Sequence, residues 1–261
     1  MEGIFMKYFV GIDIGSTCAK TIVMDEQKQI LHRLLQPTGW SSLDTAEAIR
    51  VKLEELGVDL SQAAIVATGY GRISVPYADK AVTEITCHGL GACYVHGSKN
   101  LAVIDIGGQD TKLILVEDGM VKDFIMNDKC SAGTGRFLEV MANTLGLRPD
   151  ALCELASQGG GTSISSMCTV FAESEVISLI GRGEKKENIA FAVVDSIVKK
   201  VGSQAGRLAV QGDVCLTGGL CEFAYLKDSL SHHLDKPVHA CPDGRYAGAI
   251  GAALSASKIR K

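Results

Sequence analysis

A short unit that occurs twice constrains the fold of this chain more than any other sequence feature. Residues 10–25 read VGIDIGSTCAKTIVMD and residues 102–117 read AVIDIGGQDTKLILVE. Each copy is an apolar run, a glycine turn after Asp-Ile and a second apolar run, and a polar turn and a further short strand follow. Such repetition indicates a repeated supersecondary unit. The sequence therefore predicts two copies of a β-meander.

Glycine turns of this kind suit phosphate binding, because they let backbone N–H groups approach an anion closely. An Asp at the end of each first strand can hold Mg²⁺, usually through water. One copy alone would be no more than a strand-to-turn junction, whereas two copies with matching lysines favour a clamp on one triphosphate. The residues expected to bind the nucleotide here are Asp13, Gly15, Ser16, Thr17, Lys20, Gly107, Gly108 and Gln109.

Some roles within these turns stay open at this point. Lys20 and its counterpart Lys112 either contact phosphate or are solvated strand residues. Asp105 or Gln109 could orient the water that attacks the γ-phosphate, and neither is preferred.

A third glycine turn follows towards the C-terminus. Residues 213–220 read DVCLTGGL, an apolar strand that ends in Gly218-Gly219, and we expect a helix from about Glu222 to Leu234. The N–H groups and positive end of such a helix favour a nucleoside and its inner phosphate. The stretch 244–256, GRYAGAIGAALSA, predicts a helix of small residues that packs closely against a neighbour.

These three motifs, in this order, resemble those of the acetate and sugar kinase/Hsp70/actin superfamily. The resemblance implies an α/β fold of two ribonuclease-H-like domains with an ATP cleft between them. The first domain would comprise 1–100 plus 242–261, with the first phosphate motif and the C-terminal helix. The second would comprise 101–241, with the second phosphate motif, the cysteines discussed below and the adenosine motif.

Composition narrows the possible partners. The chain has 261 residues, 46% of them hydrophobic, and a net charge of −4, so no basic surface indicates nucleic acid or anionic lipid. The apolar start Ile4–Ile14 contains Lys7 and Asp13 and predicts a strand, not a signal peptide. No apolar run approaches the roughly 18 residues that a membrane helix needs. We therefore expect a cytoplasmic protein with no nucleic-acid or membrane partner.

Two of the nine cysteines stand apart from the others. In a cytoplasmic chain most cysteines are expected to be small buried hydrophobes and not disulfides. Cys130 and Cys168, however, lie at or just before the starts of two predicted helices, 137–145 and one that runs to about Ile180. A helix N-terminus favours the thiolate, which is the form that binds metal. An Fe–S cluster takes four ligands, so a twofold homodimer would be needed to supply them.

Longer strings around these cysteines resemble one branch of the superfamily. They are GIDIGSTCAKTI, IDIGGQDTK, NDKCSAGTGRFLEVMA, MCTVFAESEVISLI and CLTGGL, and the likeness spans nearly the whole chain, including ATGYGR and EITCHG. They are similar to the activators of 2-hydroxyacyl-CoA dehydratases, a family that also contains ATP-hydrolysing subunits of benzoyl-CoA reductase.

The resemblance implies a homodimer with one [4Fe–4S] cluster at the subunit interface, bound by Cys130 and Cys168 of each subunit. It implies one-electron transfer to a dehydratase driven by hydrolysis of Mg²⁺-bound ATP to ADP, with ferredoxin or flavodoxin as the electron donor. Alternative hypotheses are a small-molecule kinase or ATPase with structural cysteines, an ATP-dependent chaperone or switch, and an electron donor to another low-potential enzyme such as benzoyl-CoA reductase. A kinase would need an acceptor pocket and a chaperone a client-binding domain, and no segment of the sequence indicates either.

Overall fold

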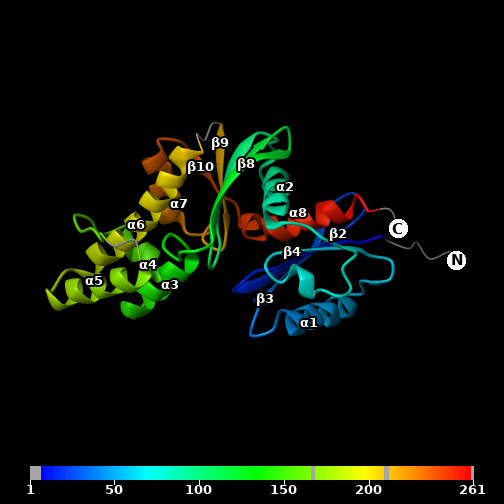
Figure 1. Ribbon diagram of the computed structural model, residues 1–261, viewed down its shortest axis with the longest axis horizontal. Helices are drawn as coiled ribbons and strands as arrows, with labels where there is room; N and C mark the ends of the chain where they lie inside the picture. Colours follow the sequence, from blue (N-terminus) through cyan, green and yellow to red (C-terminus); the bar gives the residue numbers. More distant parts are fainter. Residues whose placement is uncertain (1–6, 166–167, 209–211, 260–261) are drawn as a thin grey trace. The chain divides into compact units, whose positions relative to one another are not determined.

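The structure, a computed structural model, describes residues 7–165, 168–208 and 212–259 (Figure 1). The chain forms two compact units. The first comprises Met1–Lys99, Val116–Val121 and Tyr246–Lys261, and the second comprises Asn100–Leu115 and Lys122–Arg245. The boundaries that the sequence suggested for two ribonuclease-H-like domains, 1–100 plus 242–261 and 101–241, stay a prediction. Their ends at 1–6 and 260–261, and the first residues of the strand expected over Ile4–Ile14, lie outside the described residues.

The first unit contains a five-stranded mixed sheet in the order β3-β2-β1-β4-β5. Its strands are β1 (Phe9–Ile14), β2 (Cys18–Met24), β3 (Ile30–Pro37), β4 (Ala64–Thr68) and β5 (Lys80–Ala81). β2 pairs antiparallel with β1 and β3, whereas β4 pairs parallel with β1. The first β-meander predicted from the sequence is therefore confirmed, and a parallel strand extends it at β1.

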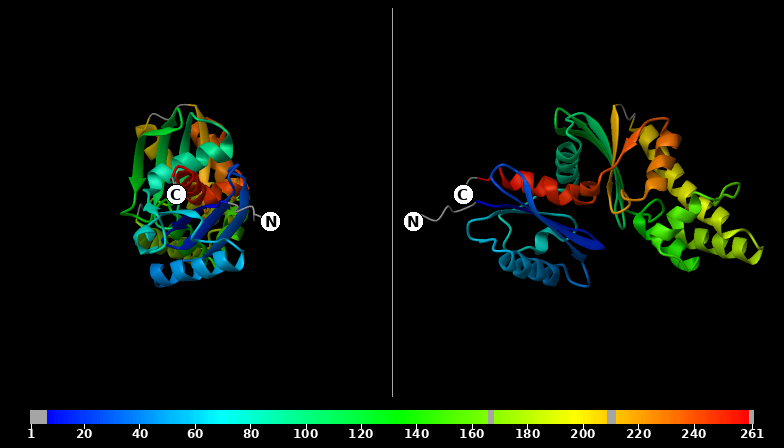
Figure 2. Two further views of the ribbon diagram at one scale, coloured as in Figure 1. Left: turned by 90° about the vertical axis from the view of Figure 1, so that its right-hand side faces the viewer. Right: turned by 180° about the vertical axis from the view of Figure 1, so that it is seen from behind.

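Helices cover both faces of this sheet: α1 (Ser42–Glu55) lies on one, and α2 (Glu84–His96) and α8 (Ala247–Ala256) lie on the other. Because side chains alternate along a strand, Val10 and Ile12 pack into the cluster with α1, and Phe9 packs into the cluster with α8. Figure 2 shows α8, in red, against the strands of the first sheet from two further sides.

Glycines allow α2, α8 and β1 to pack with their backbones almost in contact. A Cβ added at Gly91 would overlap the carbonyl oxygen of Ala247, and one at Gly251 would overlap that of Cys87. The same addition at Gly11 of β1 would overlap the backbone of α8. The expected helix of small residues is confirmed. It begins at Ala247 and not at Gly244, because Pro242–Tyr246 forms a 3₁₀ turn.

The second unit repeats the strand order of the first, with β8-β7-β6-β9-β10 corresponding to β3-β2-β1-β4-β5. Its strands are β6 (Leu101–Ile106), β7 (Thr111–Glu117), β8 (Met120–Asn127), β9 (Asp213–Gly218) and β10 (Val238–His239). β9 pairs parallel with β6, as β4 does with β1. The second predicted meander is thus confirmed, and the duplication extends to both whole sheets.

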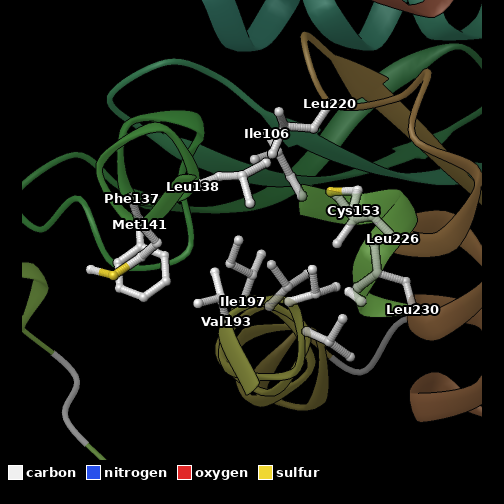
Figure 3. Packing of buried hydrophobic residues seen from close by; sticks show 14 of the residues in the cluster. Ile106, Phe137, Leu138, Met141, Cys153, Val193, Ile197, Leu220, Leu226 and Leu230 are labelled. Atoms are coloured by element: carbon white, nitrogen blue, oxygen red, sulfur yellow. The ribbon is translucent and has the colours of Figure 1, made fainter. Parts of the chain in front are cut away.

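Among the described residues, the second unit contains five helices that share one buried cluster with its sheet: α3 (Gly135–Thr144), α4 (Pro149–Ala156), α5 (Thr169–Gly181), α6 (Lys186–Arg207) and α7 (Ala224–Leu234). Figure 3 shows side chains of α3 and α6, among them Phe137, Leu138 and Ile197, gathered beneath Ile106 at the end of β6. This buried cluster supports the turn that follows β6. None of the helices in the described ranges is long and apolar enough to cross a bilayer.

The close approach of α2 and α8 predicts the effect of a single methyl group. Gly251→Ala should lower the stability of the first unit by roughly 3 kcal/mol, because the methyl group must displace backbone. Gly206→Ala is a matched control within helix α6, where an added Cβ meets no atom within 4 Å. That change should instead raise stability by about 1 kcal/mol through helix propensity. Thermal denaturation followed by circular dichroism measures both, and an unchanged melting temperature for Gly251→Ala would contradict the packing described.

Candidate functional site

The first glycine turn, Gly15–Thr17, joins β1 to β2 and is fixed at two points. The Gly15 N–H donates to the Cys18 carbonyl oxygen at 3.2 Å, which closes the turn. Thr38, which follows β3, donates its hydroxyl to the Gly15 carbonyl oxygen at 2.7 Å and its N–H to the Thr17 carbonyl oxygen at 3.0 Å. In the described part of the chain no backbone carbonyl accepts a bond from the N–H groups of Ser16 and Thr17. These two N–H groups therefore suit an anion.

Asp13 ends β1 beside this turn and is only 4% exposed. Two glycines make room for its carboxylate: a Cβ at Gly69 would lie 2.6 Å from Asp13 Oδ1, and a Cβ at Gly248 would lie 2.6 Å from Oδ2. Gly69 also has φ of +86°, a conformation that other residues rarely adopt. Reasoning from the sequence missed the roles of Gly69, Gly248 and Thr38. The available signals were the ATGYGR string, which contains Gly69, and the small-residue stretch 244–256, which contains Gly248.

The second turn, Gly107–Asp110, joins β6 to β7 and is stabilised by buried charges. The Gly107 N–H donates to the Asp110 carbonyl oxygen at 2.9 Å. Lys112 Nζ lies 2.7 Å from Asp110 Oδ1 and 3.4 Å from Asp105 Oδ2, and the three side chains are no more than 5% exposed. The possibility that Lys112 is a solvated strand residue is therefore wrong. Removing one partner of a buried ion pair lowers the stability of a protein by about 3–5 kcal/mol, so this network constrains the turn strongly.

The third turn, Gly218-Gly219, meets the second within the same unit. Thr217 donates its hydroxyl to Asp105 Oδ1 at 2.8 Å, which links β9 to β6 at the ends of both strands. Gly218 has φ of +86°, and a Cβ there would overlap the Ile106 carbonyl oxygen. The expected helix after this turn begins at Ala224 and not at Glu222, so its first N–H groups do not belong to the Gly-Gly turn itself.

The predicted nucleotide-binding residues thus fall into two groups. Asp13, Gly15, Ser16, Thr17 and Lys20 gather at the first turn in the first unit, and Asp105, Gly107, Gly108, Gln109, Gly218 and Gly219 gather at the other two turns in the second unit. The two candidates for orienting water differ in exposure. Asp105 is 1% exposed and both of its carboxylate oxygens are bonded, whereas Gln109 is exposed.

The segments that carry Cys130 and Cys168 lie side by side. Ser131 Oγ and Thr169 Oγ1, each adjacent in sequence to one of the cysteines, are 2.7 Å apart. The Asn127 side chain donates to the Cys130 carbonyl oxygen at 2.8 Å and thereby fixes the bend after β8. Cys168 is exposed and is the N-cap of α5, whereas Cys130 is half-buried. Cys130 precedes the start of α3 by a full turn that ends at the N-cap Thr134.

The second turn is bonded directly to the segment that follows Cys130. At the start of α3, Gly135 N–H donates to the Gly107 carbonyl oxygen at 2.9 Å, and Arg136 N–H donates to the Gly108 carbonyl oxygen at 2.8 Å. The Thr111 hydroxyl donates to the Gly133 carbonyl oxygen at 2.7 Å. A displacement of the turn must therefore move residues 133–136 or break these hydrogen bonds.

The remaining cysteines behave mostly as packing residues. Burial raises the pKa of the Cys87, Cys153 and Cys221 thiols to about 12, so these thiols stay protonated. No disulfide joins the nine cysteines. Over the described ranges, no three side chains of His, Cys, Asp or Glu are grouped closely enough to hold a metal ion. Among the described residues, a single chain therefore holds no complete metal site, and Cys130 and Cys168 remain the two candidate thiol ligands.

Helix α5 carries large apolar side chains on its outside. Phe171 is 68% exposed and Val170 67%, both in the first turn of the helix next to Cys168, and Ile177 and Ile180 further along are also exposed. Their buried counterparts Ala172 and Val176 form the inner face of the helix. An exposed apolar stripe of this kind is a candidate surface for binding another protein.

Known proteins are similar to this chain in sequence and in fold. The chain is 44% identical to the uncharacterized protein YjiL of Escherichia coli over 98% of this chain and 99% of that one. It is 41% identical to the (R)-2-hydroxyglutaryl-CoA dehydratase activating ATPase of Acidaminococcus fermentans over 96% and 97% of the two chains. The crystal structure of that dehydratase's component A superposes with a TM-score of 0.90, covering 96% of this chain and 98% of the other.

A second solved structure has a similar fold. The activator of 2-hydroxyisocaproyl-CoA dehydratase from Clostridium difficile, with bound ADPNP, is 34% identical and superposes with a TM-score of 0.88 over 96% and 94% of the chains. The α/β fold with two mixed sheets, as in actin-like ATPases, is confirmed. Residues 10–256 match the sequence pattern of one family over nearly the whole chain. The chain belongs to the BadF/BadG/BcrA/BcrD ATPase family.

Proposed function

We propose that this protein is an ATP-dependent activator that transfers a low-potential electron from a [4Fe–4S] cluster to a 2-hydroxyacyl-CoA dehydratase, coupled to ATP hydrolysis. Its membership in an ATPase family and the names of its relatives as dehydratase activators support the proposal. The observation that carries it is the set of hydrogen bonds that joins the second glycine turn and Thr111, which follows it, to residues 133–136 after Cys130.

The nucleotide would bind through the glycine turns. The N–H groups of Ser16 and Thr17 and the hydroxyls of the same residues would contact phosphate oxygens, as would the turn of Gly107 and Gly108. Asp13, enclosed by glycines at the end of β1, would hold Mg²⁺ through water. Gly218 and Gly219 would contact the nucleoside and its inner phosphate.

Gln109 is the better candidate to orient the attacking water. A residue with this role must reach the γ-phosphate and retain a side chain that can bond to water. Gln109 is exposed on the second turn, whereas both oxygens of Asp105 already accept bonds from Thr217 and Lys112. Asp105 would then contribute by fixing the turn through Lys112 and Thr217.

Cys130 and Cys168 are the residues that would hold the cluster. Their segments are joined through Ser131 and Thr169, and Cys168 at the start of α5 is exposed, as a ligand shared with another subunit must be. When bound, a [4Fe–4S] cluster supplies a one-electron carrier whose potential depends on charge, hydrogen bonding and solvent exposure. Four thiolates would come from two copies of the chain, so the donor set fits the group only in a dimer.

The outer face of α5 supports the homodimer. Val170 and Phe171 expose apolar surface directly beside Cys168, and burying them would exclude water from the cluster ligands. A second copy of this chain would place its own Cys168 beside the same surface, because a twofold interface uses the same patch on both subunits.

Coupling between the nucleotide and the cluster ligands would use the residues that connect them. A change in the phosphates bound at Gly107 and Gly108 would shift the carbonyl oxygens that accept from Gly135 and Arg136. The segment after Cys130 would follow, which changes the hydrogen bonding and exposure around that thiol. A reduced ferredoxin or flavodoxin would supply the electron, and the dehydratase would receive it.

The iron content tests the cluster directly. Protein purified without oxygen should contain about four irons and four sulfides per dimer, as measured by metal analysis and acid-labile sulfide. Cys130→Ala and Cys168→Ala should each lose most of this iron. Cys93→Ala, a matched change at a half-buried thiol on α2, should retain it. Iron-free wild-type protein after anaerobic reconstitution would overturn the proposal.

The role of Gln109 is tested by kinetics. Gln109→Ala should lower kcat for ATP hydrolysis by about 100-fold, the size expected for loss of a group that orients the nucleophile, with the Kd for ATP changed less than about threefold. Gln27→Ala, at an exposed glutamine in the turn between β2 and β3, is the control and should leave both values unchanged. Steady-state assays and isothermal titration calorimetry give the two quantities. A Gln109→Ala variant with wild-type kcat would rule out this role.

A further inference from the structure

The two lysines that match in the duplicated unit have different surroundings. Lys20 faces Asp13 across the β1–β2 ladder, is half-buried, and within the described residues makes no ion pair. Lys112 is buried and lies 2.7 Å from one carboxylate and 3.4 Å from another. One sequence difference accompanies this contrast: the residue that corresponds to Asp110 in the first copy is Cys18.

Lys112 could reach a ligand only by breaking two buried ion pairs, which would cost stability. Its ammonium group lies between the carboxylates of Asp105 and Asp110, whose side chains are 2% and 5% exposed. If Lys112 turned towards a phosphate, two buried carboxylates would lose their shared counter-charge. Lys20 can turn towards a phosphate without this loss, because within the described residues it makes no ion pair and Cys18 stands where the second copy has Asp110.

Asp110 connects this lysine to the shape of the glycine turn. The backbone carbonyl of Asp110 accepts the Gly107 N–H at 2.9 Å, and a Cβ at Gly107 would overlap Asp110 Oδ1. The side chain of Asp110 is thus packed directly beneath the turn and bonded to Lys112. The same Lys112 bonds Asp105 Oδ2, while Thr217 bonds Oδ1. Lys112 therefore fixes the turn and the carboxylate of Asp105 together.

We propose that Lys112 is a positioning residue, which orients Asp105 and the Gly107–Gln109 turn without touching the nucleotide, whereas Lys20 contacts phosphate. This assignment rests on the proposed function, in which ATP binds at both turns. The duplicated unit has therefore diverged in role at an identical residue: one copy uses its lysine for binding, and the other uses it for alignment.

The test compares Lys112→Met with the matched Lys20→Met. Lys112→Met should lower kcat for ATP hydrolysis about 100-fold, because Gln109 and Asp105 lose their alignment. The Kd for ATP should rise by at most about threefold, because the turn of Ser16 and Thr17 still binds phosphate. Lys20→Met should raise the Kd for ATP about tenfold, as expected for one charge-assisted hydrogen bond to phosphate. Isothermal titration calorimetry with ATP and steady-state kinetics give Kd, KM and kcat for both variants.

A double variant protects the test against a folding failure. Lys112→Met removes the ammonium group that Asp105 and Asp110 share, and adding Asp110→Asn removes the charge of one of these two buried carboxylates. The double variant should therefore regain melting temperature relative to Lys112→Met, while its kcat stays low and its Kd for ATP stays near wild type. Recovery of stability together with wild-type kcat would overturn the positioning role, because the lysine would then be structural only.

Two further results are decisive. A Kd for ATP that rises as much in Lys112→Met, or in the double variant, as in Lys20→Met would overturn the assignment, since both lysines would then bind phosphate. Wild-type protein that binds no ATP would instead overturn the proposed function, and this assignment with it. The wild-type titration therefore separates the two failures.

Discussion

Much of this structure depends on two backbone hydrogen bonds, from Gly135 to Gly107 and from Arg136 to Gly108. They join the second glycine turn to the start of α3, and a third bond from Thr111 to Gly133 strengthens the junction. Beneath the junction, Ile106 and Phe137 belong to one buried cluster, so neither side can move alone without opening the core (Figure 3). The Gly107–Gly108 turn, which suits phosphate, and the segment after the candidate metal ligand Cys130 are therefore expected to move together.

The duplication explains how this arrangement is built. Both sheets have the same strand order, and both begin with a strand that ends in Asp-Ile-Gly. The surroundings of that motif have diverged. In the first copy the Asp is enclosed by Gly69 and Gly248, whereas in the second copy it is bonded by Lys112 and Thr217. One backbone scaffold thus holds one acid among glycines and the other within a buried ion network.

The sequence predicted the fold well because its strongest signals are local. The apolar runs, the Asp-Ile-Gly turns and the small-residue helix each specify their own conformation, and the two meanders and the helix are present. The partners of Asp105 were not predictable in this way, since Thr217 reaches it from a distant strand. The burial of Lys112 was missed although its partners Asp105 and Asp110 lie close to it in sequence. The pairing of Ser131 with Thr169 was not predictable, because it depends on how α3 and α5 pack. The ligand roles of Cys130 and Cys168 and the nucleotide contacts stay predictions.

The most direct test of the central claim, that nucleotide at the second turn alters the surroundings of Cys130, is a redox titration. The midpoint potential of the reconstituted dimer would be measured by electron paramagnetic resonance with ADP and with a non-hydrolysable ATP analogue. We expect potentials that differ by about 60 mV or more, equivalent to a tenfold change in a one-electron equilibrium. Identical potentials and identical spectra in the two nucleotide states would contradict it.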